Sequence, residues 1–399
     1  MPQLNVPVRQ LDRDYLSRVQ YALTFVSEDV LSYKINEETR QVELDLKIGT
    51  DSDAVRERVN QLLERYDQGK VGFKSVIHFE HTRPLPMLDT WAGLLERKWV
   101  TPVGEGHVIL RGPAAQLMAL IDSKVDTIFV REFGAELEIF PSTIKSASLD
   151  RCNHFTSFPE HMDFVAHLKQ DFDVLEAFSR VCRKNGWSAQ LHDGNMAAQD
   201  FAISPSCCYH CYEGMEGWEL AKPGRCVTAT IGCHRYEGAN HKSLSRLRAF
   251  TMRELIWIGH PSFVLEARER AERLILKWAR EWEISGSFET ANDMFFTDEF
   301  AVKASFQRQQ EAKRELRAII PFEKQSISIF SSNFHSTTFG KAFGITVGGR
   351  PATSACIGWG YERWVYAIFS QFGFDIAQWP PALRGDYEQH LKANSNGNH

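Results

Sequence analysis

The first hundred residues combine alternating and helical patterns of apolar positions. Apolar and polar residues alternate in RQVELDLKI (40–48), which predicts a half-buried strand. Residues 51–69 repeat apolar positions at helical spacing and end at a glycine, and a second strand is predicted at 71–79. We therefore predict a small α+β domain of unknown role over residues 1–100, ending near the proline-containing stretch 81–93.

Residues 101–399 predict one larger α+β domain. Helical periods and strand-like runs follow one another along it: helices at 160–185 and 261–284, strands at 226–236, 247–258 and 326–330. The strands look antiparallel, with helices between groups of them. This order favours an antiparallel sheet flanked by helices over a doubly wound parallel sheet.

Composition narrows the class of protein. The 399 residues are 43% hydrophobic and 24% charged, with a formal net charge of -5, which gives no general attraction for nucleic acid. No run of 18 apolar residues and no apolar signal core occur, so we expect a cytoplasmic protein that does not enter a membrane. Three of the eight cysteines lie in CCYHCY (207–212), which suits a metal better than a disulfide framework.

One predicted strand carries a charge on an apolar face. In AFTMRELIWIG (249–259), Glu254 shares its face with apolar residues, namely Phe250, Met252, Ile256 and Ile258. An ionised carboxylate buried there costs several kcal/mol, roughly, unless a cation or hydrogen-bond donors meet it. We therefore expect a partner for Glu254 on the same face.

The two strands around this stretch form a hairpin that carries further charges. Arg235 and Glu237 end the first strand, and Arg246 precedes the second. Guanidinium groups bind phosphates, and a carboxylate can accept from an exocyclic amine such as that of adenine. Cross-strand ion pairing on a solvated hairpin is the alternative.

A second charged pair follows two glycines near the C-terminus. Gly358 and Gly360 stand just before Glu362 and Arg363. Glycines let a ligand approach the backbone, and an arginine at a strand-to-helix junction can hold an anion. A tight turn into a buried helix explains the same residues without a ligand.

Taken together, these segments resemble a known family. HRYEG with RLRAFTMRELIWIG resembles motif 2 of the class II aminoacyl-tRNA synthetases, and GWGYER resembles their motif 3. ELEIFPSTIK is placed at motif 1, which would put Pro141 at a dimer interface. Five segments are similar to the amino acid:[carrier protein] ligases, relatives of the methanogen-type seryl-tRNA synthetase: SPSCCYHCY, MRE, ANDMFF, SSNFHSTTFGKAFGI and SACIGWGYERW. The resemblance covers about residues 105–385 and implies a class II synthetase-like catalytic domain.

The resemblance also implies a zinc site. The matching ligands are Cys208, Glu254 and Cys356, and the fourth position is left for the α-amino group of the substrate. Glu254 would then be neutralised by the cation. Cys207 is the alternative to Cys208, and a local cluster of cysteines with His210 is the alternative to the dispersed site.

The implied reaction begins with amino-acid activation by ATP. Arg235 would stabilise charge on the α-phosphate, Arg363 would hold the γ-phosphate and Glu237 would bind adenine, with Arg246 nearby and Mg²⁺ bridging the phosphates. Three polar residues are candidates for the amino-acid pocket, or else structural polar groups: Asp293, Asn333 and His335.

The resemblance implies transfer of the aminoacyl group to the phosphopantetheine thiol of a carrier protein, by a homodimer that prefers a small amino acid. Helix 262–282 and the charged segment 306–319 are candidate docking surfaces, or ordinary solvated faces. The alternative acceptor is tRNA, which we do not expect, because the first hundred residues are slightly acidic and contain no coiled-coil arm. A third hypothesis is a paralogue that has lost the activity. The motif arginines and all three implied zinc ligands are present, which argues against it.

Overall fold

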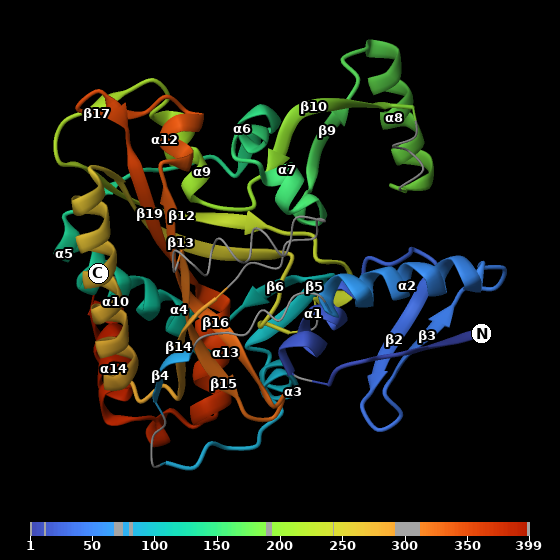
Figure 1. Cartoon of the computed structure of the whole chain (residues 1–399), viewed down its shortest axis with the longest axis horizontal. Helices are drawn as coiled ribbons and strands as arrows, with labels where there is room; N and C mark the ends of the chain where they lie inside the picture. Colours follow the sequence, from blue (N-terminus) through green and yellow to red (C-terminus); the bar gives the residue numbers. More distant parts are fainter. Residues whose placement is uncertain are drawn as a thin grey trace.

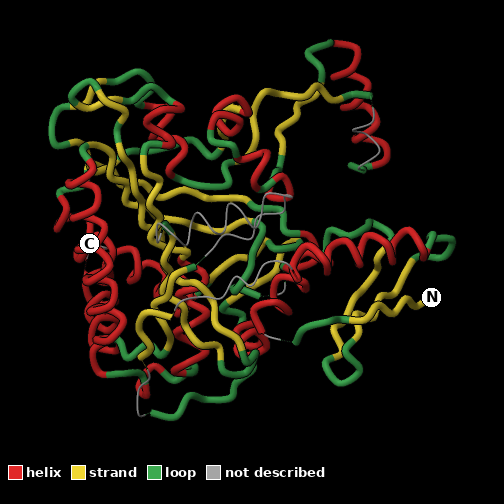
Figure 2. The backbone as a smooth tube through the Cα atoms, viewed as in Figure 1, coloured by secondary structure: helices red, strands yellow, loops and turns green. Residues whose placement is uncertain are grey.

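The protein, analysed as a computed structural model, forms a small sheet near its N-terminus and a large sheet in the remainder of the chain (Figure 1). The structure describes residues 2–11, 13–67, 75–79, 83–188, 194–241, 243–291 and 312–396. Figure 2 shows a group of helices beside the strands of the large sheet, while the small sheet lies to one side with helices of its own.

The small sheet contains three antiparallel strands in the order β1-β3-β2. Its elements are β1 (Gln3–Pro7), α1 (Arg13–Leu23), β2 (Val30–Asn36), β3 (Gln41–Leu46) and α2 (Ser52–Asp67). The alternation predicted at 40–48 is β3, which buries Val42, Leu44 and Leu46 in the core shared with α1 and α2. The predicted helix is α2, and the Asp51 side chain caps it by accepting from the backbone of Asp53 and Ala54.

The strand predicted at 71–79 is β4 (Ser75–Phe79), and it does not join the small sheet. It pairs antiparallel with β14 (Gly286–Thr290) at the edge of the large sheet. Phe79 packs into the main core there. The sequence did not predict this pairing, because an alternating pattern specifies a strand but not the sheet that the strand joins. The chain has therefore reached the large sheet well before residue 100.

The large sheet has eight strands in the order β4-β14-β15-β16-β19-β13-β12-β7. All neighbours are antiparallel except β12 and β7 (Glu136–Leu137), which are parallel. The central strands are β15 (Lys313–Ile320), β16 (Gln325–Ser336), β19 (Thr353–Gly360), β13 (Ala249–Gly259) and β12 (Gly224–His234). The predicted antiparallel sheet with flanking helices is confirmed.

One face of this sheet is covered by helices (Figure 1). The helix predicted at 261–284 is α10 (Pro261–Glu281), and α13 (Tyr361–Phe372) follows β19 directly. Trp278 of α10 stacks on Trp364 of α13 with ring centroids 4.7 Å apart, in the same core as Trp257 of β13. Because strand residues alternate, the opposite face remains for the site described below.

The helix predicted at 160–185 and the docking surface proposed at 306–319 are each wrong in part. The stretch 160–185 begins with a short 3-10 turn and β9 (Phe164–Leu168), and only α8 (Phe172–Asn185) is helical. The β9 segment instead pairs with β10 (Met196–Ile203), which also pairs with β8 (Thr143–Lys145). In the segment 306–319, residues 306–311 lie outside the described residues, and the part from Lys313 onward is the central strand β15.

The remaining elements complete the body. They are α3 (Thr90–Glu96), β5 (Val100–Gly104), β6 (His107–Leu110), α4 (Gly112–Val125), α5 (Arg131–Phe133), α6 (Ser146–Arg151), α7 (His154–Ser157), α9 (Cys208–Gly214), β11 (Glu219–Leu220), α12 (Thr338–Ala342), β17 (Thr346–Val347), β18 (Arg350–Pro351) and α14 (Pro381–Asn396). Among the described helices, none combines the length and apolar character needed to span a bilayer.

Candidate active site

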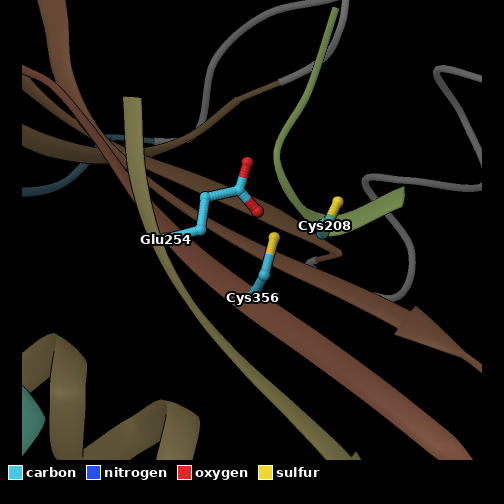
Figure 3. A group of neighbouring side chains, drawn as sticks. All are labelled: Cys208, Glu254 and Cys356. Atoms are coloured by element: carbon cyan, nitrogen blue, oxygen red, sulfur yellow. The ribbon is translucent and has the colours of Figure 1, made fainter. Parts of the chain in front are cut away.

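Three side chains from separate elements converge on the open face of the sheet: Cys208 at the start of α9, Glu254 of β13 and Cys356 of β19 (Figure 3). Their ligand atoms all lie within 4.8 Å of one another, and all three residues are buried. Glu254 is paired with Gly358 and Ile256 with Cys356, so Glu254 and Cys356 are two register positions apart and share one face. The fold therefore gathers the predicted ligand set.

This cluster holds acidic groups in a buried place. Burial raises the pKa of Glu254, and hydrogen bonds from Cys356 and Cys208 offset only part of that rise. The contact with Cys208, together with burial, raises the pKa of the Cys356 thiol well above its usual value. The hydrogen bond with Cys356 lowers the pKa of Cys208, but burial and the charge of Glu254 outweigh it. Without a cation, protons are therefore held on these groups.

The donor set fits a zinc ion. Among the described residues, the buried Oε2 atom of Glu254 has no hydrogen-bond partner, whereas Oε1 accepts from Ser206 at 3.3 Å. A buried carboxylate oxygen left without a donor is costly unless a cation meets it. Two thiols and one carboxylate match the ligands that Zn²⁺ takes in proteins, and three such ligands leave a fourth position open.

Cys207, the alternative ligand, points elsewhere. It is the residue before α9, and its Sγ donates to the carbonyl of Ala229 at 3.6 Å in a separate apolar cluster. Because Cys207 and Cys208 are adjacent residues at the start of a helix, their side chains point in different directions. His210 contacts Ser204 Oγ at 3.0 Å, and Cys211 lies in the core, so the local cysteine and histidine cluster does not form among the described residues.

Two of the predicted pocket residues lie beside Cys356. Asn333 Nδ2 donates to Cys356 Sγ at 3.7 Å, and His335 Nε2 lies 3.7 Å from the same sulfur. The other nitrogen of His335 lies 3.2 Å from the hydroxyl of Tyr212. Asp293 lies outside the described residues. Sequence reasoning missed Ser206 and Tyr212, whose only signal was their place beside the cysteines in SPSCCYHCY.

The second group of predicted residues lies around Glu237. This carboxylate is buried and ion-paired with Arg246. Burial alone would raise its pKa, but the positive charges of Arg246, Arg363 and Arg235 contribute to lowering the pKa of Glu237 to about 2. Glu237 is therefore ionised at neutral pH, among several guanidinium groups.

The guanidinium groups are fixed by backbone carbonyls. Arg235 Nε donates to the carbonyl of Pro205 at 2.9 Å, and Arg363 Nε donates to that of Ser245 at 2.8 Å. Burial and the neighbouring Arg246 lower the pKa of Arg363 to about 10. An anionic ligand would relieve the crowding of like charge between these arginines.

Glu362, which sequence reasoning placed next to Arg363 without a role, ties α13 to β13. Its carboxylate accepts the backbone N–H of Thr251 at 2.9 and 3.0 Å. Burial raises the pKa of Glu362 to about 7. The contact fixes the first turn of α13 and with it the position of Arg363.

Both groups of residues line the same cavity, whose volume is about 1040 Å³. Cys208, Glu254 and Cys356 belong to its wall, as do Arg235, Glu237 and Arg363, while Gly358 and Gly360 keep part of the wall free of side chains. A cavity of this size admits a nucleotide together with a small molecule. The geometry brings the predicted zinc ligands and two of the predicted phosphate-binding arginines into one space.

Comparison with known proteins places the chain in a family, although no family model matches it. It is 31% identical over 287 residues to amino acid--[acyl-carrier-protein] ligase 1 of Bradyrhizobium diazoefficiens, covering 71% of this chain and 84% of that protein. It is 25% identical over 398 residues to the type-2 serine--tRNA ligase of Methanopyrus kandleri, covering 94% of this chain and 75% of that protein.

Solved structures agree on the fold. The M. kandleri SerRS, solved with A. aeolicus tRNASec, superimposes with a TM-score of 0.73 at 20% identity over 98% of this chain and 78% of that one. Seryl-tRNA synthetase from Pyrococcus horikoshii, complexed with ATP, gives a TM-score of 0.59 at 12% identity over 84% and 81%. With 31% identity across 84% of the Bradyrhizobium ligase, the chain belongs to the family of amino acid--[acyl-carrier-protein] ligases and has the class II aminoacyl-tRNA synthetase fold.

Proposed function

We propose that this protein activates an amino acid with ATP and transfers the aminoacyl group to the phosphopantetheine thiol of a carrier protein. The observation that carries the proposal is the shared cavity, lined by the cysteine and glutamate cluster and also by Arg235 and Arg363. Two substrates held in one space, with their reacting groups oriented, react far faster than in solution.

Cys208, Glu254 and Cys356 are the residues that would hold a Zn²⁺ ion. When bound, the ion would supply a Lewis-acid position for the α-amino group of the substrate. Ser206 and Asn333 orient the ligands through hydrogen bonds to Glu254 and Cys356. A site that binds the α-amino group selects amino acids as a class and not one side chain. We propose separately, from the family resemblance, that the substrate has a small side chain.

The anion-binding residues serve the activation step. A carboxylate oxygen of the amino acid forms a bond to the α-phosphorus of ATP, the bond from that phosphorus to the bridging oxygen breaks, and pyrophosphate leaves. Arg235 stabilises the charge that develops on the α-phosphate, and Arg363 holds the γ-phosphate. Mg²⁺, when bound with ATP, would neutralise part of the phosphate charge. Glu237, kept ionised by the arginines around it, accepts from the amine of adenine.

The acceptor distinguishes this proposal from a tRNA ligase. The relatives matched at 30% and 31% identity are named as carrier-protein ligases, which supports a carrier thiol. The match to the M. kandleri serine--tRNA ligase over 94% of the chain is the observation that favours tRNA as the second candidate. The first step is the same in both cases, so only the acceptor separates them.

We propose that the protein is a cytoplasmic homodimer. Pro141 follows two strongly exposed apolar residues, Leu137 and Ile139, on a surface that a second copy would cover. All eight cysteines are free, which suits a reducing compartment. Sedimentation analysis of the wild type and of Ile139→Asp tests the assembly, and a monomeric wild type would refute it.

ATP–pyrophosphate exchange with each amino acid in turn tests the activation step. We expect Mg²⁺-dependent exchange with a small amino acid such as glycine or alanine. Absence of exchange for every amino acid would overturn the proposed function and favour a paralogue that kept the fold without the activity.

A further inference from the structure

The N-terminal part of the chain reaches the candidate nucleotide site. The loop between β12 and β13 carries Glu237 and Arg246, and residues of α1, of β2 and of the turn after α1 pack against it. Figure 1 shows α1 lying between the small sheet and the body of the protein. This contact joins two regions that are more than two hundred residues apart in sequence.

Asn240 is the polar anchor of this contact. Its Nδ2 donates to Thr24 Oγ1 at 3.0 Å and to the carbonyl of Glu237 at 2.8 Å. Its Oδ1 accepts from the Tyr33 hydroxyl at 3.4 Å, and that hydroxyl lies 2.8 Å from Thr24 Oγ1. One amide therefore links the backbone of Glu237 to two side chains of the N-terminal unit.

Tyr21 forms the second part of the contact. The guanidinium carbon of Arg246 lies 5.1 Å from the centroid of the Tyr21 ring, and the Tyr21 hydroxyl donates to Glu160 at 3.2 Å. Only 5% of Tyr21 is exposed. A guanidinium over an aromatic face is attracted by the ring, more strongly when both are shielded from water. Tyr21 thus holds Arg246, which is the ion-pair partner of Glu237.

The loop has a glycine where the N-terminal unit comes closest. Gly238 has φ of +57°, and a Cβ added there would lie 2.2 Å from Thr24 Cγ2. Both the backbone conformation and the lack of space exclude a side chain at this position. The glycine in the loop is therefore what allows Thr24 of the N-terminal unit to lie so close to the loop backbone.

From these contacts we propose that the N-terminal unit is a working part of the nucleotide site, in which Tyr21 is a positioning residue that holds Arg246 and Glu237 in place for ATP. The inference rests on the proposed function, because it assigns the loop to ATP. It predicts that loss of the contact weakens ATP binding while the amino-acid site around Cys208, Glu254 and Cys356 is spared.

The first test compares Tyr21→Ala with Tyr21→Phe in pyrophosphate exchange. The alanine variant removes the ring under Arg246 and should raise the KM for ATP about tenfold, as expected for losing a shielded cation–π contact. The KM for the amino acid should stay within about twofold of the wild type. The phenylalanine variant keeps the ring and should restore most of the ATP affinity.

The second test uses the close approach at Gly238. Gly238→Ala should raise the KM for ATP, and adding Thr24→Ser should recover part of the loss, because serine removes the clashing methyl group and keeps the oxygen that binds Asn240. The strain of a positive φ remains in the double variant, so recovery is partial. A double variant no better than Gly238→Ala would show that the unit does not sit on the loop during the reaction.

The outcomes separate this inference from the function on which it rests. Melting temperatures, together with titration of a non-hydrolysable ATP analogue, distinguish loss of nucleotide affinity from loss of folding. If wild-type protein shows no exchange, the proposed function fails. If it exchanges normally and Tyr21→Ala keeps the wild-type KM for ATP, or raises both KM values equally, the positioning role of Tyr21 is overturned.

Discussion

Glu254 and Cys356 lie on neighbouring antiparallel strands, two register positions apart, and both point into the cavity from the face opposite the helices. The relationship explains how a carboxylate is kept on an otherwise apolar strand face. The Oε2 atom of Glu254, which has no hydrogen-bond partner in the described part of the chain, lies in a cluster with the Cys208 and Cys356 thiols, and this cluster suits a cation.

The first prediction is that the purified protein carries about one zinc ion per chain through this cluster. Cys356→Ala and Glu254→Gln should each lower the metal content and abolish pyrophosphate exchange, because each removes one ligand. Cys226→Ala is the matched control, since Cys226 is a buried thiol in the main core on the helix-covered side. Zinc measured by plasma emission that persists in the double variant Cys208→Ala, Cys356→Ala would rule out this site.

The second prediction concerns Arg235, the guanidinium proposed for the α-phosphate. Arg235→Ala should lower the rate of exchange on the order of 10²–10³-fold, since it removes a group that stabilises charge in the transition state. Arg225→Ala is the control and should have little effect, because Arg225 lies at the start of β12, away from Arg235 just beyond its end, and pairs with Glu136. Equal losses in the two variants would point to a general effect on β12.

The third prediction uses a glycine of the cavity wall. A Cβ at Gly358 would lie 3.4 Å from Glu254 Cγ and 3.5 Å from Ser331 Oγ, so the fold can accept it. Gly358→Ala should keep the melting temperature near that of the wild type but raise the KM for the amino acid several-fold. Gly232→Ala, on β12 with open space around it, is the control. An unchanged KM in Gly358→Ala would place the amino acid elsewhere.

The fourth prediction concerns stability and pH at Glu362. Its pKa is about 7 in the folded protein and 4.5 in the ordinary state, so between these values the folded protein holds a proton that the unfolded chain has lost. The free energy of unfolding should therefore fall as pH rises through this window. Glu362→Gln should remove that contribution. The free energy of unfolding of the variant, relative to that of the wild type, should therefore be higher at pH 8 than at pH 5 in urea titrations. Identical pH profiles would contradict the shifted pKa.

Much of the fold was predictable because one side of each element is buried. Alternation gave β3 and β13, and helical spacing gave α2 and α10. The assignment of β4 failed because its pattern fits either sheet, and 160–185 was misread because a short strand precedes α8. The charged segment 306–319 was proposed as a docking surface, yet its described part from Lys313 onward belongs to the central strand β15.

The site was predictable in a different way. Glu254 stood out physically, as a charge on an apolar face, whereas Cys208 and Cys356 came only from the family resemblance. No local pattern links Tyr21 or Asn240 to the nucleotide site, because that contact depends on how the N-terminal unit sits against a distant loop. The hydrogen bond from the Thr251 backbone to the Glu362 side chain was likewise hidden, since it joins β13 to the first turn of α13, more than a hundred residues away in sequence.

The acceptor is the most direct test of the account. Wild-type protein is incubated with ATP, Mg²⁺, the amino acid preferred in exchange and a phosphopantetheinylated carrier protein, and intact masses are measured. We predict that the carrier gains one aminoacyl mass, that the apo-carrier gains none, and that hydroxylamine removes the added group as it does a thioester. Efficient charging of total tRNA, with no aminoacylated product from any carrier, would contradict the account and establish a tRNA ligase instead.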